Sequence, residues 1–361
     1  MLQYYFSFLR FSLNDNAEIP DCIDKIVWHD LLGFAKKQSL VGVFFHGMQR
    51  LTSGKNKPTD DDVMEWFSCV KQIREKNKMM YEKSALVVKN FNIEGFRCCI
   101  LKGQGNALMY ADPYMRQSGD IDVWVEGGPK KAIEYVRKLC PKSKAVYHHI
   151  DFTRMKGVEI EVHYRPSFMN NMIANYRLQR FFMAEAERQF CNKVLLPDNL
   201  GEISVPTLHF NRIFQMSHIS NHFFHEGIGL RQLVDYYLLL KKGFDEKERK
   251  EEEILLKRFG MIKIARAVMY VLQEIFELEE DLLIVKPDQR RGKKLLREII
   301  EGGNFGQYDK RVGNDVSANA FQKNLQRVYR DVRMAMLFPS ESLWEPIFRL
   351  YHFFWRLYYK R

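Results

Sequence analysis

The sequence predicts an α+β fold in which a small mixed β-sheet, part of an α/β core, is flanked by N-terminal and C-terminal helical regions. Three observations support this prediction. Apolar residues follow helical spacing through the first part of the chain, short apolar runs closed by glycine turns follow, and helical spacing returns after Pro206. We place the N-terminal helical region at 1–92, the α/β core at 93–200 and the C-terminal helical domain at 201–361.

The composition is that of a folded globular protein, with 46% hydrophobic and 28% charged residues among 361. Lys and Arg outnumber Asp and Glu by 56 to 45, and the formal charge of +11 favours polyanionic partners such as nucleotides, nucleic acid or anionic lipid. Because the basic residues are scattered among acids, solvated helix faces explain this charge equally well. The six cysteines form no CxxC pair and no apolar run reaches about 18 residues, so we expect reduced thiols, no membrane span and a cytoplasmic location.

A long helix is expected at the end of the N-terminal region. Gly, Asn, Pro and Asp residues break the helical pattern over residues 55–62 and indicate a surface loop. Thr59, followed by three aspartates, is a good helix cap, because its hydroxyl can accept a hydrogen bond from a free backbone N–H. The helix should run from about Val63 to Asn90.

Short strands define the core. Strands are expected over Phe96–Leu101 and Ile121–Val125, and the second is followed by glycines and a helix over Lys130–Leu139. Two alternating stretches, Ala145–Phe152 and Val158–Tyr164, flank a glycine turn and predict a hairpin. Further helices are expected over 208–242, 246–259 and 262–277, with a last set ending at Arg361.

Two aspartates at the start of a predicted strand carry the functional interpretation. Asp120 and Asp122 are two residues apart, so a strand would direct both carboxylates to one face. Paired carboxylates repel and resist burial unless a cation compensates them, and Mg²⁺ suits hard oxygen ligands. Two such ions need a third carboxylate. Glu161, in the middle of a predicted strand, is preferred to Glu159, which lies close to a turn.

A glycine turn precedes the aspartates. Lys102 and Gly103 end one predicted strand, and Gln104 begins a helix, so backbone N–H groups and a helix N-terminus would face an anion such as a triphosphate. Glycine is favoured there because a Cβ would obstruct the approach of phosphate oxygens to the backbone. Lys102 and Arg116 could add positive charge, Arg116 through bidentate contact with phosphate.

These motifs resemble the DNA-polymerase-β-like nucleotidyltransferase superfamily, with its glycine turn, Asp-x-Asp pair and third carboxylate. More narrowly, the chain is similar to an uncharacterised bacterial nucleotidyltransferase family. The similarity is carried in order by Leu101-Lys102-Gly103, Tyr110-Ala111-Asp112-Pro113, Arg116, Gly119 to Asp122, and Glu161 to Tyr164, and later by His218, Arg231, Asp235 and the loop from Gly302 to Gly306. One departure is Gln104, which stands where well-characterised members have Ser or Gly.

The resemblance implies a Mg²⁺-dependent enzyme that transfers a nucleoside monophosphate from a nucleoside triphosphate to a hydroxyl of a small molecule, RNA or protein. Asp120, Asp122 and Glu161 would hold two Mg²⁺ ions, or Mn²⁺ in their place, and Glu161 would also act on the acceptor hydroxyl. Gly103 would cradle phosphate. Two rival functions stay open, namely a nucleotide sensor without chemistry, suggested by Gln104, and a nucleic-acid-binding protein, suggested by the positive charge.

The C-terminal region carries features with ordinary structural explanations. His218, His222 and His225 are interpreted as structural residues of a polar seam, since no carboxylate completes a metal set with them. Arg231 and Asp235, four residues apart on one helix, should form a salt bridge. The Gly302–Gly306 segment should terminate a helix, and residues 349–361 should form an amphipathic helix packed on the domain rather than a surface for nucleic acid or membrane.

Overall fold

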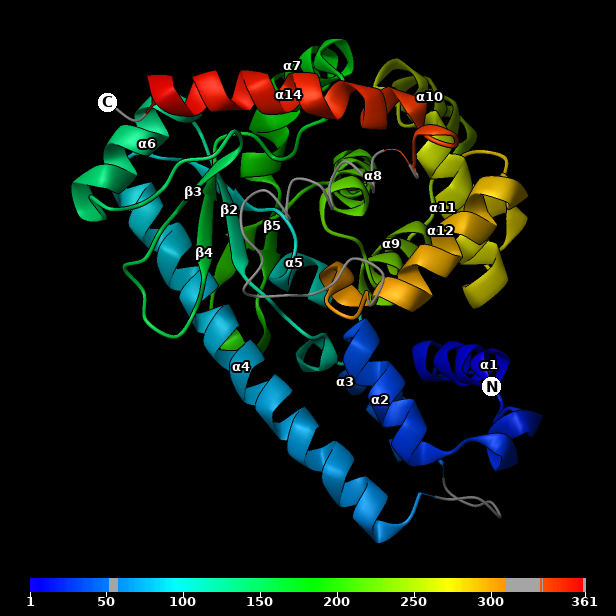
Figure 1. Cartoon of the computed structure of the whole chain (residues 1–361). Helices are drawn as coiled ribbons and strands as arrows, with labels where there is room; N and C mark the ends of the chain where they lie inside the picture. Colours follow the sequence, from blue (N-terminus) through cyan, green and yellow to red (C-terminus); the bar gives the residue numbers. More distant parts are fainter. Residues whose placement is uncertain (52–57, 310–331, 333, 360–361) are drawn as a thin grey trace.

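The computed structural model describes residues 1–51, 58–309, 332 and 334–359 (Figure 1). It confirms the predicted α+β class, with a four-stranded mixed sheet and a two-stranded sheet among many helices. The strands are β1 (Cys98–Ile100), β2 (Ile121–Val125), β3 (His149–Asp151), β4 (Ile160–His163), β5 (Lys193–Leu195) and β6 (Glu202–Ser204). The helices are α1 (Leu2–Leu13), α2 (Trp28–Gln38), α3 (Val41–Gln49), α4 (Asp60–Ile93), α5 (Gln104–Ala107), α6 (Gly128–Leu139), α7 (Met172–Cys191), α8 (Leu208–His225), α9 (Leu230–Leu240), α10 (Glu246–Arg258), α11 (Ile262–Phe276), α12 (Gln289–Gly302) and α14 (Pro339–Tyr358).

The larger sheet has the strand order β1-β2-β4-β3. Its two central strands are parallel, while β1 and β3 pair antiparallel at the edges. The predicted hairpin is confirmed, because β3 and β4 are antiparallel neighbours. The register aligns Asp122 with Glu161, and His149 with His163, so each pair projects from the same side of the sheet.

The two sides of this sheet differ sharply in character. The side that we call the core face carries apolar residues at alternate positions, and they pack in one cluster with apolar residues of α4 and α6. The core face comprises Ile100, Ile121, Val123, Val125, Ile150, Ile160 and Val162. The opposite side, the site face, comprises Asp122, Trp124, His149, Glu161 and His163.

Helix α4 is the long helix predicted before the core, and in Figure 1 it runs along one side of the molecule, from the N-terminal helices to the sheet. The Thr59 hydroxyl accepts a hydrogen bond from Asp62 N, and the Asp62 carboxylate accepts one from Thr59 N, which together form a capping box. The predicted cap is confirmed, and the helix extends beyond its predicted bounds at both ends. Residues 55–57 of the predicted preceding loop lie outside the described residues.

The N-terminal and C-terminal helices share one hydrophobic core. Phe8 of α1 and Phe44 of α3 belong to the same buried cluster as Phe214 of α8 and Ile275 of α11. The predicted helix over 208–242 is wrong in one respect, because it is broken into α8 and α9 by a turn that contains glycines 227 and 229. Helix α7 and the β5–β6 hairpin have no counterpart among the predicted elements. None of the helices in the described part of the chain is long and apolar enough to cross a membrane.

Candidate active site

The site face brings two predicted carboxylates together. Asp122 and Glu161 lie in register on the neighbouring strands β2 and β4, and His163 lies between their side chains. His163 Nε2 is 2.9 Å from Asp122 Oδ1 and 3.2 Å from Glu161 Oε2. Glu159 is exposed, so the structure favours Glu161 as the carboxylate that can act together with Asp122.

The other predicted carboxylate is connected to these residues through a lysine. Asp120 precedes β2 and is partly exposed, with 34% of its side-chain surface accessible. Lys102 Nζ lies 4.0 Å from Asp120 Oδ2 and 3.2 Å from Asp122 Oδ2. The ammonium thus partly neutralises both aspartates. Its third neighbour is His218 Nε2 of α8, at 2.8 Å.

The glycine turn has the predicted strand–turn–helix form. Gly103 has a φ of +59° and caps the four-residue helix α5. This left-handed conformation strains a residue that has a Cβ, which explains the glycine. The Gln104 side chain does not enter the pocket in front of the turn. It is buried instead against α4, where it accepts a hydrogen bond from Ser84 and approaches Ser118 Oγ at 3.4 Å.

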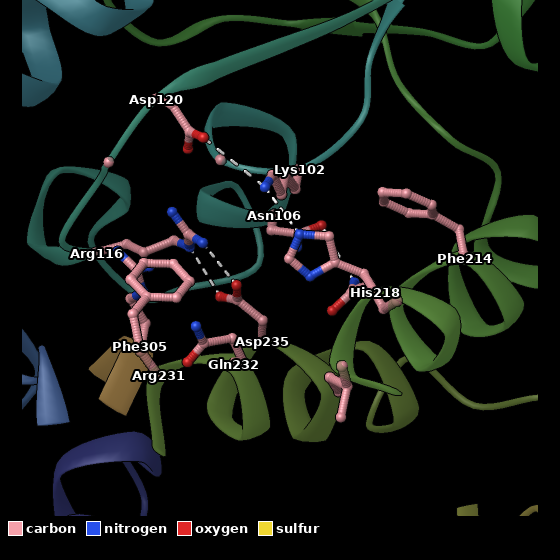
Figure 2. A pocket seen from close by; sticks show the side chains of 14 residues that line it. Lys102, Asn106, Arg116, Asp120, Phe214, His218, Arg231, Gln232, Asp235 and Phe305 are labelled. Atoms are coloured by element: carbon pink, nitrogen blue, oxygen red, sulfur yellow. Dashed lines mark hydrogen bonds and ion pairs between the residues drawn. The ribbon is translucent and has the colours of Figure 1, made fainter. Parts of the chain in front are cut away.

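A pocket opens beside this turn, between the sheet domain and the helices α8 and α9 (Figure 2). Lys102, Gly103 and Asp120 form one wall, and Phe214 and His218 of α8 form another. Arg116, Arg231, Gln232 and Phe305 complete it. The Gly302–Gly306 segment ends α12 as predicted, and its Phe305 also lines the pocket, although the sequence favoured a helix-terminating turn over a segment in contact with a nucleotide.

Two arginines of the pocket differ in their contacts. Arg116 is buried, and its Nε and Nη2 donate to the two carboxylate oxygens of Asp235 at 2.8 and 2.6 Å. The predicted salt bridge of Asp235 with Arg231 is therefore wrong, because Arg116 occupies that carboxylate. Arg231 Nη1 donates to the Gln117 carbonyl at 2.6 Å, while its buried Nε has no hydrogen-bond partner among the described residues.

Histidines surround the carboxylates more closely than the sequence indicated. His149 Nδ1 lies 3.1 Å from Glu161 Oε2 and 3.1 Å from His148 Nε2. His218 contacts Lys102 and, at 3.0 Å, His222. The interpretation of His218 as a purely structural residue misses its place in the pocket wall. His148 and His149 were not predicted as site residues. The only signal in the sequence was that two histidines stand next to each other.

The electrostatics of the cluster follow from these contacts. Burial would raise the pKa of Asp122, but Lys102 and His163 outweigh it and hold that pKa below its ordinary value. Burial alone would lower the pKa of His163, yet its hydrogen bonds to Asp122 and Glu161 raise that pKa to about 9. Burial lowers the pKa of His149 to about 4. His163 is thus a cation at neutral pH, and His149 is neutral.

The donor set is compatible with a divalent cation. Asp122 Oδ2 is buried without an aligned hydrogen-bond donor among the described residues, although the Lys102 ammonium forms an ion pair with it. Ligand atoms of Asp122, Glu161 and His163 all lie within 4.8 Å of one another. Such a buried, incompletely satisfied carboxylate beside a second one is what a metal ion would compensate.

Residues 24–277 match a family described as uncharacterised nucleotidyltransferase. The chain belongs to this family. The matched span contains both the four-stranded sheet and the helices that close the pocket, so it confirms the family-level resemblance. No curated protein matches the chain. Among solved structures, it is similar to an antigenic nucleotidyltransferase-like protein from Paracoccidioides brasiliensis, with 12% identity, a TM-score of 0.35, and coverage of 58% of this chain and 94% of that one.

Proposed function

We propose that the protein is a metal-dependent nucleotidyltransferase that transfers a nucleoside monophosphate from a nucleoside triphosphate to an acceptor hydroxyl. One observation carries the proposal. Asp122 and Glu161 are in register on adjacent parallel strands, and the Gly103 turn and Lys102 lie beside them at the mouth of a pocket. This combination joins a cation-binding carboxylate pair to an anion-binding turn, which is what transfer from a triphosphate requires.

Asp120, Asp122 and Glu161 would hold Mg²⁺, as two ions, or Mn²⁺ in their place. Bound there, such ions would supply charge stabilisation at the reacting phosphorus. The protonated His163 meanwhile bridges Asp122 and Glu161, so it holds both carboxylates on the site face. Since a proton and a metal ion would compete for these oxygens, metal binding should strengthen as His163 loses its proton.

The chain's own groups would bind and orient the triphosphate. The Gly103 turn admits phosphate oxygens close to the backbone, and Lys102 provides positive charge next to it. Arg231 can donate to phosphate through N–H groups that the Gln117 carbonyl does not use. Arg116 lines the pocket, but its Nε and Nη2 donate to Asp235, so the predicted contact with phosphate would have to come from its Nη1.

In the reaction, the acceptor oxygen would attack the α-phosphorus in line, and pyrophosphate would leave toward the basic side of the pocket. Glu161 is the candidate that accepts the proton of the acceptor hydroxyl, because 28% of its side chain is exposed whereas Asp122 is fully buried. No covalent intermediate with the protein is needed.

The test is transfer of label from α-labelled triphosphates to acceptor pools in the presence of Mg²⁺. We expect wild-type protein to transfer label and Asp122→Asn to reduce the rate by about 10²–10³-fold or more, since loss of one group that stabilises developing charge typically costs that much. Asp281→Asn makes the same chemical change at an exposed position and should have no effect. Equal rates for the Asp122 variant and wild type would exclude this mechanism.

A second candidate, nucleotide binding without transfer, is favoured by two observations. The Lys102 ammonium already lies between Asp120 and Asp122, and the Gln104 side chain is turned away from the pocket. Calorimetry separates the two functions. Binding of a triphosphate with no turnover across small-molecule, RNA and protein acceptors would support the sensor.

A further inference from the structure

Beside the carboxylate pair lies a cluster of imidazoles, of which the proposed transfer uses only His163, as the bridge between Asp122 and Glu161. His148 and His149 lie at the start of β3, and His163 lies opposite His149 on β4. One ring nitrogen from each of the three lies within 4.8 Å of the other two. Glu161 Oε2 borders the same space, 3.1 Å from His149 Nδ1 and 3.2 Å from His163 Nε2.

We propose that His148, His149 and His163, together with Glu161, form a second metal site that binds a transition-metal ion of the Zn²⁺ class. The site is distinct in chemistry from the oxygen-only pair of Asp120 and Asp122. Imidazole nitrogen with one carboxylate is the donor set of Zn²⁺, Co²⁺ and similar ions, whereas Mg²⁺ prefers oxygen. The site shares Glu161 and His163 with the proposed transfer site but does not require a nucleotide.

The spacing of the donor atoms suits a single bound ion. Zn²⁺ binds imidazole nitrogen at about 2.0–2.1 Å, which places neighbouring ligands of a tetrahedral site roughly 3.3 Å apart. The contacts from His149 Nδ1 to His148 Nε2 and to Glu161 Oε2 are both 3.1 Å. Small movements of side chains would therefore admit an ion between them.

Hydrogen bonds alone leave this cluster incompletely satisfied. His149 Nδ1 carries at most one proton, so if it donates to Glu161 it has no lone pair to accept from His148. If His148 Nε2 is instead unprotonated, the proton of that ring resides on Nδ1, which is buried without a partner among the described residues. A metal ion would remove the conflict between the two facing nitrogens, because it accepts a lone pair from His149 Nδ1 and from His148 Nε2. His163 Nε2 would join as a ligand by releasing its proton.

A backbone carbonyl orients one of the three rings, that of His163, toward the cluster. The Arg165 carbonyl lies 3.2 Å from His163 Nδ1 and can only accept, so Nδ1 carries a proton and Nε2 is directed at the cluster. The His148 carbonyl accepts hydrogen bonds from Tyr164 N and Arg165 N, which anchors the strand start. Carbonyl acceptors of this kind commonly orient metal-bound imidazoles.

The experiment titrates full-length, chelator-stripped protein with Co²⁺ in excess Mg²⁺ and records visible absorption. We expect one Co²⁺ per chain with the strong bands of four- or five-coordinate Co²⁺, displaced by Zn²⁺. His149→Ala and His148→Gln should each weaken Co²⁺ binding at least tenfold. His29→Ala, at an exposed position of α2, is the matched control and should bind as wild type does. Thermal melting checks that each variant is folded, and the wild-type titration stands even where one variant is not.

Three results would overturn the site: no Co²⁺ uptake by wild type in Mg²⁺, unchanged affinity in both histidine variants, or loss of uptake in Asp122→Asn alone. The transfer assay keeps this inference separate from the proposed function. Co²⁺ uptake with these variant effects but no nucleotidyl transfer would retain the imidazole site and remove the enzyme. Transfer without Co²⁺ uptake would do the reverse.

Discussion

The core face and the site face of the four-stranded sheet belong to the same strands but are stabilised by different interactions. Apolar side chains on the core face pack against α4 and α6, so burial stabilises them directly. On the site face, Asp122 is fully buried and Glu161 mostly so, and both lie among cationic or neutral nitrogen groups. Trp124 packs against Phe190 and Phe210, but the polar part of that face is stable only as far as its charges compensate one another.

The difference shows how a small sheet can support a reactive site. Burial of the apolar face can offset the free-energy cost of the buried charges on the other face. Both faces belong to the same strands, because successive residues of a strand point to opposite sides of the sheet. In β2, Val123 on the core face follows Asp122 on the site face. Each face can therefore be changed by mutation without direct loss of contacts on the other.

The largest effect is expected from removing Lys102, the ammonium that forms ion pairs with the two aspartates. Lys102→Met leaves Asp122 and Asp120 without the ammonium, and breaking a buried charge pair of this kind typically costs about 3–5 kcal/mol. We expect that loss of unfolding free energy in chelator, measured by urea denaturation. Added Mg²⁺ should recover part of it, because a bound ion would replace the missing charge.

Ile100→Ala is the counterpart on the core face. Ile100 is fully buried in the sheet cluster, and an Ile→Ala change in a core costs about 2–5 kcal/mol through lost burial and a residual cavity. Mg²⁺ should not alter this loss. If Lys102→Met unfolds like wild type in chelator, or if Mg²⁺ rescues Ile100→Ala equally, the two faces do not differ in the way described.

The core face was predictable from the sequence, whereas much of the site face was not. Strand β2 was predicted with its observed bounds, because period-two alternation within a short β-rich run is a local signal. The same alternation predicted that Asp122 and Glu161 point away from the apolar face of their strands. Their register across two strands depended on topology that no local pattern encodes.

Several contacts that the sequence did not predict join distant elements. His218 contacts Lys102, which is 116 residues away in the sequence. Asp235 forms an ion pair with Arg116, 119 residues away, whereas Arg116 was predicted to be available for phosphate. Helix propensity says nothing about which face of α8 or α9 meets the sheet domain. Helix α7 did carry a local signal, since the Asn171 side chain accepts from Ile173 N and Ala174 N as a helix cap.

Glu341 is a buried carboxylate that can be compared with Asp122. Its described partners are backbone amides, whereas those of Asp122 are Lys102 and His163. It lies in α14, accepts a hydrogen bond from Asn170 N at 2.7 Å, and burial raises its pKa to about 7. The folded state holds its proton more tightly than the unfolded state, whose pKa is near 4.5. Stability should therefore fall as pH rises from about 4.5 to 7, by up to about 3 kcal/mol.

Glu341→Gln keeps an acceptor oxygen without the charge, so it should remove this pH dependence. We expect urea denaturation to give equal stability at pH near 4.5 and a more stable variant at pH 8, by about 2–3 kcal/mol. Glu82→Gln changes an exposed carboxylate of α4 in the same way and should track wild type at both pH values. If the unfolding free energies of wild type and Glu341→Gln change with pH in parallel, the folded protein ionises Glu341 without loss of stability, contrary to this prediction.

The smallest effect is expected at Arg231, where a cation faces the pocket with its Nε unpaired among the described residues. Burial, aided by repulsion from Arg116, lowers the pKa of Arg231, so an anion in the pocket would relieve an unfavourable charge. Arg231→Gln should weaken triphosphate binding by about tenfold to a hundredfold, the range of about 1.5–3 kcal/mol expected for hydrogen bonds to a charged group. Its effect on unfolding should be small, because the one hydrogen bond lost is to the Gln117 carbonyl.

Calorimetry with inorganic tripolyphosphate and with a nucleoside triphosphate measures this effect with and without a base. Arg177→Gln, at an exposed arginine of α7, is the matched control. A loss of affinity for both ligands places Arg231 at the phosphates, as its charge requires. A loss for the nucleotide alone would instead assign Arg231, together with the Phe305 ring 5.7 Å from its guanidinium, to the nucleoside. Unchanged affinity for both would mean that the triphosphate is held without Arg231, by the charges of Lys102 and Arg116 and the backbone of the Gly103 turn.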